Sequence, residues 1–478
     1  MNFATGDNRG HLFAKGDAIC RVYTGTDQTY PQRIYSLYCQ HHLECIGIVQ
    51  TERQPDGSFL HPRLSITYPH EWCPGMFKEA VLFHLDLLMA LDDVGLTLKD
   101  ALPENILFHH GRAVFVDFFS LVTDEDLERE TWLPPSPQGK RYSVLDTLFV
   151  PYMLLPLIRY AEGRFAEGRL LLSNAFCNNA EDISNPAFVL SDNAFRRRMD
   201  LILRTLLNRN PSPNALIIQR IISLLRGERT CWINDIRILR KLVAALDVTV
   251  HTSGYTDYYK AKNENFPLAD QSSWQEKQRS YAQVLEQCQP TTLLELGGNT
   301  GWFPRLAAAR GVTVVATDID MACVEHMHWH MRFTGESITP LWLSFDDLSA
   351  EQYSLDAAGH RQEHPLHMAA TKRLPCQMVS CLGLIHHLTL GMGKPFAEIA
   401  GVLHRLCQKA LLLEFVSLDD NLIYENQNFF PSISKWNTNT YSVNALLQAF
   451  EPFFHLQQSL PSSPVQSRSL LLFKPVDK

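Results

Sequence analysis

A glycine-rich bend in the second half of the chain carries the residues best suited to chemistry. An apolar run that contains Glu295 leads into glycines at 297, 298 and 301, and then into a plausible helix start. A second apolar run ends at Asp318. Such a bend presents backbone to a cofactor, and an acidic residue at the tip of the next strand can accept both hydroxyls of a ribose. The two elements predict a nucleoside-bearing cofactor.

The glycine spacing does not fit a dinucleotide site. That fingerprint needs Gly-x-Gly-x-x-Gly, because its second glycine lets a pyrophosphate approach the backbone. Counted from Gly297, the second position is Asn299, so the pattern fails. For the bend alone, an ordinary strand-turn-helix that binds no ligand stays an open interpretation. Asp318 and the elements that follow count against that interpretation.

An alternation of strands and helices must position this bend. We predict helices at Val324 to Arg332, Pro395 to Leu406 and Val443 to Phe450, and strands at Pro340 to Phe345, Met378 to Leu382 and Ala410 to Val416. Residues 454–456 and Ser469 to Phe473 are expected to form a closing antiparallel hairpin. Strands separated by helices give a mostly parallel sheet. The predicted fold class is therefore α/β.

Residues from about 250 to the end resemble a class I S-adenosylmethionine-dependent methyltransferase. The segments LLELGGNTGWF, VVATDID, LGLIHHL and LLLEFV are especially similar to a bacterial group that includes nodulation-type proteins. SITYPHEW, GLTLKDALPENILF and AVFVDFFSL are similar to the N-terminal half of that group. The resemblance implies a Rossmann-like domain with a mostly parallel seven-stranded sheet and S-adenosylmethionine as cofactor. It implies no particular substrate.

The resemblance also implies which residues contact the cofactor. These are Glu295, Gly297, Gly298, Asn299, Gly301, Asp318, Ile319, Ser344, Phe345, Asp346 and Leu382. Glu295 is expected near the cofactor's positive charge, and the glycines are expected to give clearance. Ser344 departs from the family, since such enzymes often carry an Asp there for the adenine amino group. Either Ser344 bonds the adenine edge while Phe345 stacks on the ring, or Asp346 shifts into the role.

Two adjacent histidines follow the predicted fourth strand of this domain. Methyl transfer depends largely on positioning, and a base is needed only if the acceptor must lose a proton. His386 or His387 is the candidate catalytic base, because imidazole titrates near neutral pH. The alternative is that one packs and the other caps or meets solvent. No Asn-Pro-Pro-Tyr signature follows, which argues against a base or amide nitrogen as acceptor, and Glu414 is a weaker acceptor-site candidate. Three tyrosines before the domain are candidates to cover the cofactor: Tyr255, Tyr258 and Tyr259.

The first half carries a second constellation. The spacing of Asp100, Asn105 and Asp117 resembles the catalytic loop and metal-binding Asp of protein kinases and aminoglycoside phosphotransferases. That resemblance implies that Asp100 orients an acceptor hydroxyl while Asn105 and Asp117 hold magnesium, with ATP as cofactor. The apolar pattern from Met76 to Leu91 suits the helix before this loop. SITYPHEW is a candidate for the strand and hinge beside an adenine.

Other parts of a kinase are poorly matched. No Gly-x-Gly-x-x-Gly loop opens the chain, and the usual His before the catalytic Asp is replaced, since Leu98 and Lys99 precede Asp100. Residues 1–70 are short for a nucleotide-binding lobe, and neither Lys15 nor Arg21 lies in a clear phosphate-binding motif. Three interpretations stay open for this half: an active or atypical kinase, a degenerate module that holds substrate or nucleotide, and a structural hairpin with a capped loop.

Size and composition complete the prediction. At 478 residues the chain exceeds what one core usually supports, so we expect a kinase-like or substrate-recognition domain at 1–250, with a helical lobe from about 71, and a methyltransferase domain at 251–478. A net charge of -8 argues against a nucleic-acid partner. The 11 cysteines without Cys-x-x-Cys spacing, and a start without a signal peptide, predict a cytoplasmic protein with no membrane partner. We expect a small-molecule or protein substrate, and the oligomeric state stays open.

Overall fold

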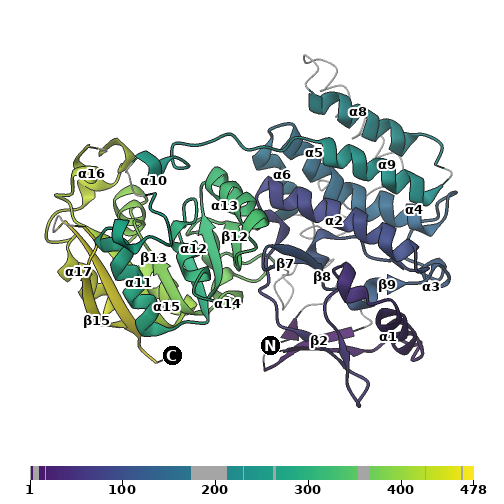
Figure 1. Ribbon diagram of the computed structural model, residues 1–478, viewed down its shortest axis with the longest axis horizontal. Helices are drawn as coiled ribbons and strands as arrows, with labels where there is room; N and C mark the ends of the chain where they lie inside the picture. The colour runs from purple at the N-terminus through teal and green to yellow at the C-terminus, as the bar shows by residue number, and fades with distance from the viewer. Residues whose placement is uncertain are drawn as a thin grey trace. The chain divides into compact units, whose positions relative to one another are not determined.

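The chain forms two compact units in the computed structural model (Figure 1). The structure describes residues 2–3, 10–16, 18–173, 213–229, 231–261, 265–353, 367–425, 427–463 and 467–477. One unit comprises Met1–Val250 together with Gln352–His367, and the other comprises His251–Glu351 with Met368–Lys478. The segment Gln352–His367, which the sequence assigned to the second domain, is thus grouped with the first unit. Part of the predicted helical lobe, 174–212, lies outside the described residues.

A five-stranded antiparallel sheet opens the first unit. Its strands lie in the order β1 (Asn2–Phe3), β2 (Gly10–Lys15), β3 (Ala18–Tyr23), β5 (Phe59–Pro62) and β4 (Glu52–Arg53). Helix α1 (Tyr30–Gln40) connects β3 to β4. The expectation that SITYPHEW contains a strand is wrong, because the last strand ends at Pro62 and a short 3-10 turn, η2 (Pro69–Glu71), follows. Residues 1–70 looked short for a nucleotide-binding lobe, but they hold this whole sheet because each of its strands is short.

Helices and two small strand pairs make up the rest of the first unit. Helix α2 (Pro74–Asp92) is buried along most of its length and leads to the pair β6 (Thr97–Leu98) and β9 (Leu121–Val122). The predicted hairpin is present as β7 (Ile106–His109) and β8 (Arg112–Phe115). Its turn residues His110 and Gly111 have φ of 48° and 69°, the left-handed values that tight hairpins need. The other helices are α3 (Asp124–Glu128), α4 (Lys140–Val144), α5 (Leu155–Ala161), α6 (Phe165–Ser173), α8 (Pro213–Arg226) and α9 (Trp232–Ala245).

One continuous helix in the first unit is apolar enough to resemble a membrane span. It runs over Lys140–Ala161, through α4, the π-helical segment η5 (Leu145–Leu154) and α5. Pro151 lies inside η5, and the helix continues through it. By length and composition this helix qualifies as a candidate span, but 72% of its apolar window is buried inside the protein. Such burial is what the core helix of a globular unit shows.

The second unit contains a seven-stranded sheet, which confirms the predicted α/β fold. Five strands run parallel in the order β12 (Ile338–Trp342), β11 (Thr313–Asp318), β10 (Thr292–Leu296), β13 (Cys376–Cys381) and β14 (Cys407–Val416). The closing hairpin of β15 (Phe454–Pro461) and β16 (Arg468–Pro475) adds antiparallel strands, with β16 next to β14. The predicted third strand is displaced, since β12 ends at Trp342 and Ser344 to Asp346 lie in a turn.

Two helical layers enclose this sheet (Figure 1). Helix α11 (Glu276–Cys288) packs against α12 (Trp302–Ala308), while α15 (Phe396–Leu406) packs against α14 (Ala370–Arg373) and α17 (Val443–Phe450). Helix α13 (Met321–Thr334) lies along β11 and β12. The strand order reverses at β10, because the chain goes from it to β11 on one side and later returns to β13 on the other. Ligands of open α/β sheets bind at the carboxyl ends of the strands at such a point.

Candidate functional site

The glycine-rich bend folds tightly over the end of β11. The backbone N–H groups of Gly297 and Gly298 both donate to the carbonyl oxygen of Thr317, each at 2.9 Å. Gly297, Asn299 and Gly301 have φ of 73°, 49° and 92°, so the chain reverses through left-handed conformations. Glycine adopts these without strain, and Asn tolerates them better than most residues. Gly301 then begins α12.

The glycines leave room for protein atoms as well as for any ligand. A Cβ on Gly301 would lie 2.9 Å from Cγ of Met327, and one on Gly298 would lie 3.4 Å from Cβ of Ala316. Packing against α13 therefore requires glycine at 301, whereas a Cβ at 298 would make an ordinary van der Waals contact with β11. A Cβ on Gly297 would lie 3.7 Å from Leu384, which places the loops after β10 and β13 side by side. Clearance for a cofactor stays a prediction for all three.

Asp318 organises the bend through both of its carboxylate oxygens. One accepts the backbone N–H of Asn299 at 2.8 Å, and the other accepts the backbone N–H of Asp320 at 2.8 Å. Burial raises the pKa of Asp318 to about 6. Each oxygen keeps lone-pair capacity for a further donor such as a ribose hydroxyl. Ile319, also predicted to contact the cofactor, is exposed, and its carbonyl accepts the indole N–H of Trp342 at 3.0 Å.

Glu295 lies inside the unit. It is 1% exposed, and the hydroxyl of Tyr281 donates to its carboxylate at 3.3 Å. Burial raises the pKa of Glu295 to about 7. A carboxyl group in this state changes charge near neutral pH, unlike an ordinary glutamate. Its predicted proximity to a positive charge on the cofactor stays a prediction.

The segment before α11 crosses the carboxyl edge of the sheet. The Asn299 side-chain amide donates to the Tyr255 carbonyl at 3.0 Å, and Tyr255 is 48% exposed. Burial raises the pKa of Tyr255, and the nearby Asp318 carboxylate adds to the rise. Tyr258 interacts electrostatically with Arg468, which begins β16. This segment thus extends from the neighbourhood of Asp318 to that of Arg468, and its cover of a cofactor stays a prediction.

The residues expected at the adenine lie after β12. The Ser344 hydroxyl donates to Asp347 at 2.9 Å, and the Ser344 backbone N–H donates to the same carboxylate. Phe345 is buried, with the Lys394 ammonium 6.0 Å from its ring centroid. Asp346 pairs with Lys394 at 2.5 Å. Each of these groups therefore has a partner within the protein. Leu382, the remaining predicted contact, is buried just after β13.

The two histidines predicted as bases both pack against the ring of Phe430. His386 is 4% exposed, and its ring centroid lies 4.3 Å from that of His387 and 5.7 Å from that of Phe430. Burial lowers the pKa of His386 well below its usual value, and His387 adds to this. Burial also lowers the pKa of His387. Both imidazoles are therefore neutral at physiological pH, which is the form that can accept a proton.

Two ion pairs beside these histidines were not predicted from the sequence. Lys277 of α11 donates to Glu414 of β14 at 2.6 Å, and the Ser462 hydroxyl donates to the other oxygen of Glu414. Although burial opposes ionisation, Lys277 keeps the pKa of Glu414 below its usual value. Arg468 binds Asp420 through two nitrogens, each at 2.8 Å. These partners come from distant segments, so local spacing held no signal for Lys277, Asp420 or Arg468.

The structure also brings together the three kinase-like residues of the first unit. The backbone N–H of Val116, next to Asp117, donates to the carbonyl of Asn105 at 2.8 Å. The Asn105 side chain donates to the Asp100 carbonyl at 3.4 Å, and the Asp100 N–H donates to the hydroxyl of Ser120 at 3.0 Å. The predicted catalytic loop and the predicted metal-binding turn are thus neighbours.

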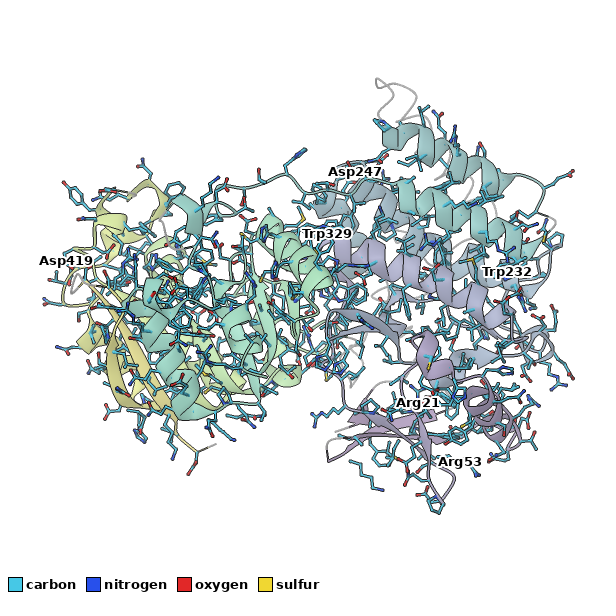
Figure 2. The ribbon with its side chains drawn as sticks, in the orientation of Figure 1. Arg21, Arg53, Trp232, Asp247, Trp329 and Asp419 are labelled. Carbon is cyan, nitrogen blue, oxygen red and sulfur yellow. The ribbon has the colours of Figure 1, made fainter. Side chains whose placement is uncertain are left out.

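Asp117 nevertheless has a cationic protein partner. Arg21 on β3, labelled in Figure 2, pairs with it at 2.6 Å and also donates to the carbonyl of Val116 at 3.2 Å. The Arg21 guanidinium lies 5.6 Å from the ring centroid of Phe119. Among the residues that the structure describes, no group of three or more His, Cys, Asp or Glu side chains is placed to hold a metal ion. Magnesium binding by Asn105 and Asp117 stays a prediction.

Comparisons with known proteins give one sequence relative and several partial structural likenesses. No protein-family model matches the chain. It is 25% identical over 370 residues to "Nodulation protein NoeA" of Rhizobium meliloti (strain 1021), a match that covers 76% of this chain and 71% of that protein. The bifunctional kinase-methyltransferase WbdD is matched with a TM-score of 0.28 and 13% identity over 41% of this chain and 37% of that one.

N-methyltransferase NodS from Bradyrhizobium japonicum WM9 is matched with a TM-score of 0.29 and 8% identity, over 42% of this chain and 97% of that one. The chain thus spans well under half of WbdD and nearly all of NodS. The chain is similar to a nodulation protein over most of its length, and its second unit has a Rossmann-like fold with a largely parallel seven-stranded sheet.

Proposed function

We propose that the second unit is an S-adenosylmethionine-dependent methyltransferase and that the first unit recognises its substrate. The observation that carries this proposal is the arrangement of Asp318 and the bend. At the point where the strand order reverses, a carboxylate fixed by two backbone N–H groups lies beside a glycine-rich turn. Two of the partly matched structures, NodS and WbdD, are named as methyltransferases.

In this proposal the protein acts mainly by positioning. S-adenosylmethionine supplies an activated methyl group on a sulfonium when bound. Asp318 accepts the ribose hydroxyls, and the bend between Gly297 and Gly301 lies against the amino acid end. Tyr255 covers the site from the segment before α11. An in-line displacement then needs the acceptor atom held close to the methyl group with water excluded.

The acceptor side is formed by the loops after β13 and β14. His386 and His387 are neutral there and can take a proton from a hydroxyl or an amine of a small molecule or protein. Phe430 gives the ring pair an apolar wall. We propose His387 as the acting base, because its lesser burial leaves it closer to an incoming acceptor. His386 then supports it from the interior. We further propose that the protein works in the cytoplasm without a nucleic-acid or membrane partner.

Calorimetry with S-adenosylmethionine tests the donor site. Asp318→Ala should weaken binding by at least about tenfold, because a charge-assisted hydrogen bond is worth about 1.5–3 kcal/mol. Asp477→Ala, which removes an exposed carboxylate of the same unit, should leave the affinity unchanged. Circular dichroism should show that both variants keep the fold. Absence of binding by the wild-type protein, or an affinity that ignores Asp318→Ala, would refute the proposal.

A second candidate function belongs to the first unit, which we propose as a nucleotide-binding module or an atypical kinase. The observation in its favour is that Asp100, Asn105 and Asp117 converge, with Arg21 close by. ATP with magnesium would bind there, and Asp117→Ala would abolish that binding. The same calorimeter tests this, and ATP binding that persists in Asp117→Ala would exclude the proposed metal site. If the first unit does bind ATP through Asp117, the methyltransferase unit would have a supporting or regulatory role.

A further inference from the structure

The loop after β13 and part of the connection after β14 lie side by side in the second unit. The backbone N–H of Ser432 donates to the carbonyl oxygen of Leu390 at 2.9 Å. A Cβ on Gly391 would lie 3.6 Å from the carbonyl oxygen of Phe429. The loop after β13 also reaches the glycine-rich bend through Leu384. A molecule bound between these two loops would therefore lie next to the methyl donor of the proposed function.

Two buried side chains in the loop after β13 have unused hydrogen-bonding atoms. Nδ1 of His386 and Oγ1 of Thr389 are buried and make no hydrogen bond within the described parts of the chain. Buried polar atoms are nearly always hydrogen-bonded in folded proteins. Thr389 belongs to the π-helical turn η8 (His387–Gly391), and such turns are frequent at functional sites. The two unused atoms therefore indicate that a polar group of a ligand binds here.

The charged groups around His386 are already paired with one another. His386 interacts electrostatically with Lys277, Arg468 and Asp420. Lys277 is bound to Glu414, and Arg468 is bound to Asp420. These two cations and two anions balance, so none of the four is left to offset the charge of an ionic ligand. Because an uncompensated charge is costly in a buried site, this arrangement favours an uncharged ligand.

Large apolar side chains border the same two loops. Phe430 is buried, and its ring centroid lies 5.7 Å from that of His386 and 5.5 Å from that of His387. Phe429, its neighbour in the chain, is 67% exposed, and Met392, which follows Gly391, is 48% exposed. Exposed apolar side chains that gather beside a polar site often mark a ligand-binding surface. We therefore expect the ligand to have an apolar part beside its polar group.

The histidines restrict which hydroxyl group can lose its proton here. Burial lowers the pKa of His386 and of His387, so each imidazole is a weaker base than an ordinary histidine. General-base catalysis is efficient only when the base is strong enough for the proton that it takes. A phenolic hydroxyl has a pKa of about 10. An aliphatic hydroxyl ionises only near the pKa of water, about 15.7. A weak base among aromatic rings therefore fits a phenol better than an aliphatic alcohol.

We propose that the methyl acceptor is a small uncharged phenol with an apolar substituent. This inference rests on the proposed function and names its substrate class. The hydroxyl hydrogen-bonds to His386 and Thr389 beside His387, and the substituent lies against Met392 and Phe429. The hydroxyl gives its proton to a ring nitrogen of His387, and its oxygen forms the new bond to the methyl carbon. The carbon–sulfur bond of the donor breaks and its electron pair stays on sulfur. The products are an aryl methyl ether, a neutral thioether and a proton that leaves His387 for solvent.

Four probes of matched size test this inference on the full chain. In calorimetry with S-adenosylhomocysteine present, para-butylphenol should bind at least about tenfold more tightly than the cation para-butylbenzylamine or the anion para-butylbenzoate. In mass spectrometry with S-adenosylmethionine, para-butylphenol should become its methyl ether, whereas para-butylcyclohexanol should not react. His387→Gln should lower the transfer to para-butylphenol at least about a hundredfold and leave its binding almost unchanged.

Two pairs of variants locate the acceptor. Thr389→Val removes the unused hydroxyl with little change in shape and should weaken para-butylphenol binding at least about threefold, whereas Thr389→Ser should keep it. Phe429→Ala should weaken binding of para-butylphenol but not of phenol itself, because only the former has an apolar substituent. Phe333→Ala, at an exposed phenylalanine on α13, should change neither affinity. Unchanged binding of S-adenosylhomocysteine shows that each variant is folded.

The outcomes separate this inference from the proposed function. Binding of S-adenosylhomocysteine without binding of para-butylphenol refutes the phenol but leaves the methyltransferase proposal standing. Failure of S-adenosylhomocysteine itself to bind refutes both. Equally tight binding of para-butylbenzoate would indicate that a cation such as the exposed Lys435, close to Gly393, serves the acceptor, and would refute an uncharged acceptor. Transfer to para-butylcyclohexanol as fast as to para-butylphenol would refute the preference for a phenol.

Discussion

Glu104 gives a prediction whose magnitude follows from its surroundings. It lies in the predicted catalytic loop of the first unit, within the 3-10 turn η3 (Pro103–Asn105). Although the residue as a whole is partly exposed, both carboxylate oxygens are buried and neither has a hydrogen-bond partner in the described chain. Burial raises the pKa of Glu104 to about 8, and the neighbouring Asp100 adds to the rise. The carboxyl group is therefore protonated at neutral pH.

The raised pKa makes the stability of the first unit depend on pH. A carboxyl group whose pKa is higher in the folded state contributes stability below its unfolded pKa, and this stability is lost as pH rises through the folded pKa. For Glu104 the window runs from 4.5 to about 8. The difference corresponds to about 5 kcal/mol at most, because each pKa unit is worth about 1.4 kcal/mol. Relaxation that admits water reduces this figure, so we expect at least about 2 kcal/mol.

The perturbation is Glu104→Gln, which removes the titration with little change in shape. At pH 4 the variant and the wild type should be equally stable, and the advantage of the variant should grow through the window to about 2–5 kcal/mol at pH 9. Urea unfolding followed by pulsed hydrogen exchange of α2 peptides reports on this unit alone, which matters because a two-unit chain need not unfold in one step. Glu52→Gln, at an exposed strand position, is the control. An equal loss of stability between pH 6 and pH 9 in Glu104→Gln and wild type would refute the reasoning.

Two further substitutions test the packing that holds the sites. Gly301→Ala places a Cβ 2.9 Å from Met327 at φ of 92°. It should lower the free energy of unfolding by about 1–3 kcal/mol, measured by thermal unfolding, and weaken donor binding. Gly335→Ala, at φ of 69° with open space around it, measures the contribution of the backbone conformation alone. Equal costs for the two would show that the Met327 contact does not matter. Arg21→Met should destabilise the first unit by about 1–3 kcal/mol, because it leaves the Asp117 side chain, which is 15% exposed, without its cation. Adding Asp117→Asn should restore much of this loss in urea unfolding. No recovery in the double variant would mean that Arg21 acts through packing.

Local pattern predicted most of the second unit. The helices at 395–406 and 443–450 and the closing hairpin lie where the sequence placed them, because apolar periodicity and turn residues are local signals. The third strand was predicted at Pro340 to Phe345, too far toward the C-terminus of the chain, because β12 spans Ile338–Trp342. Pro340 was taken as its start, but it lies in the middle of β12, at the edge of the sheet, where a missing N–H is tolerated.

The sequence by itself determined the residue types and spacing of the bend, of Asp318 and of the Asp100, Asn105 and Asp117 series. Only the tertiary structure decided what those residues contact. It placed Arg21 on Asp117, turned Glu295 toward α11, and joined Lys277 to Glu414. The physical reason is that charge balance in a buried site depends on groups from distant segments, which meet only when the sheet and its covering helix have formed.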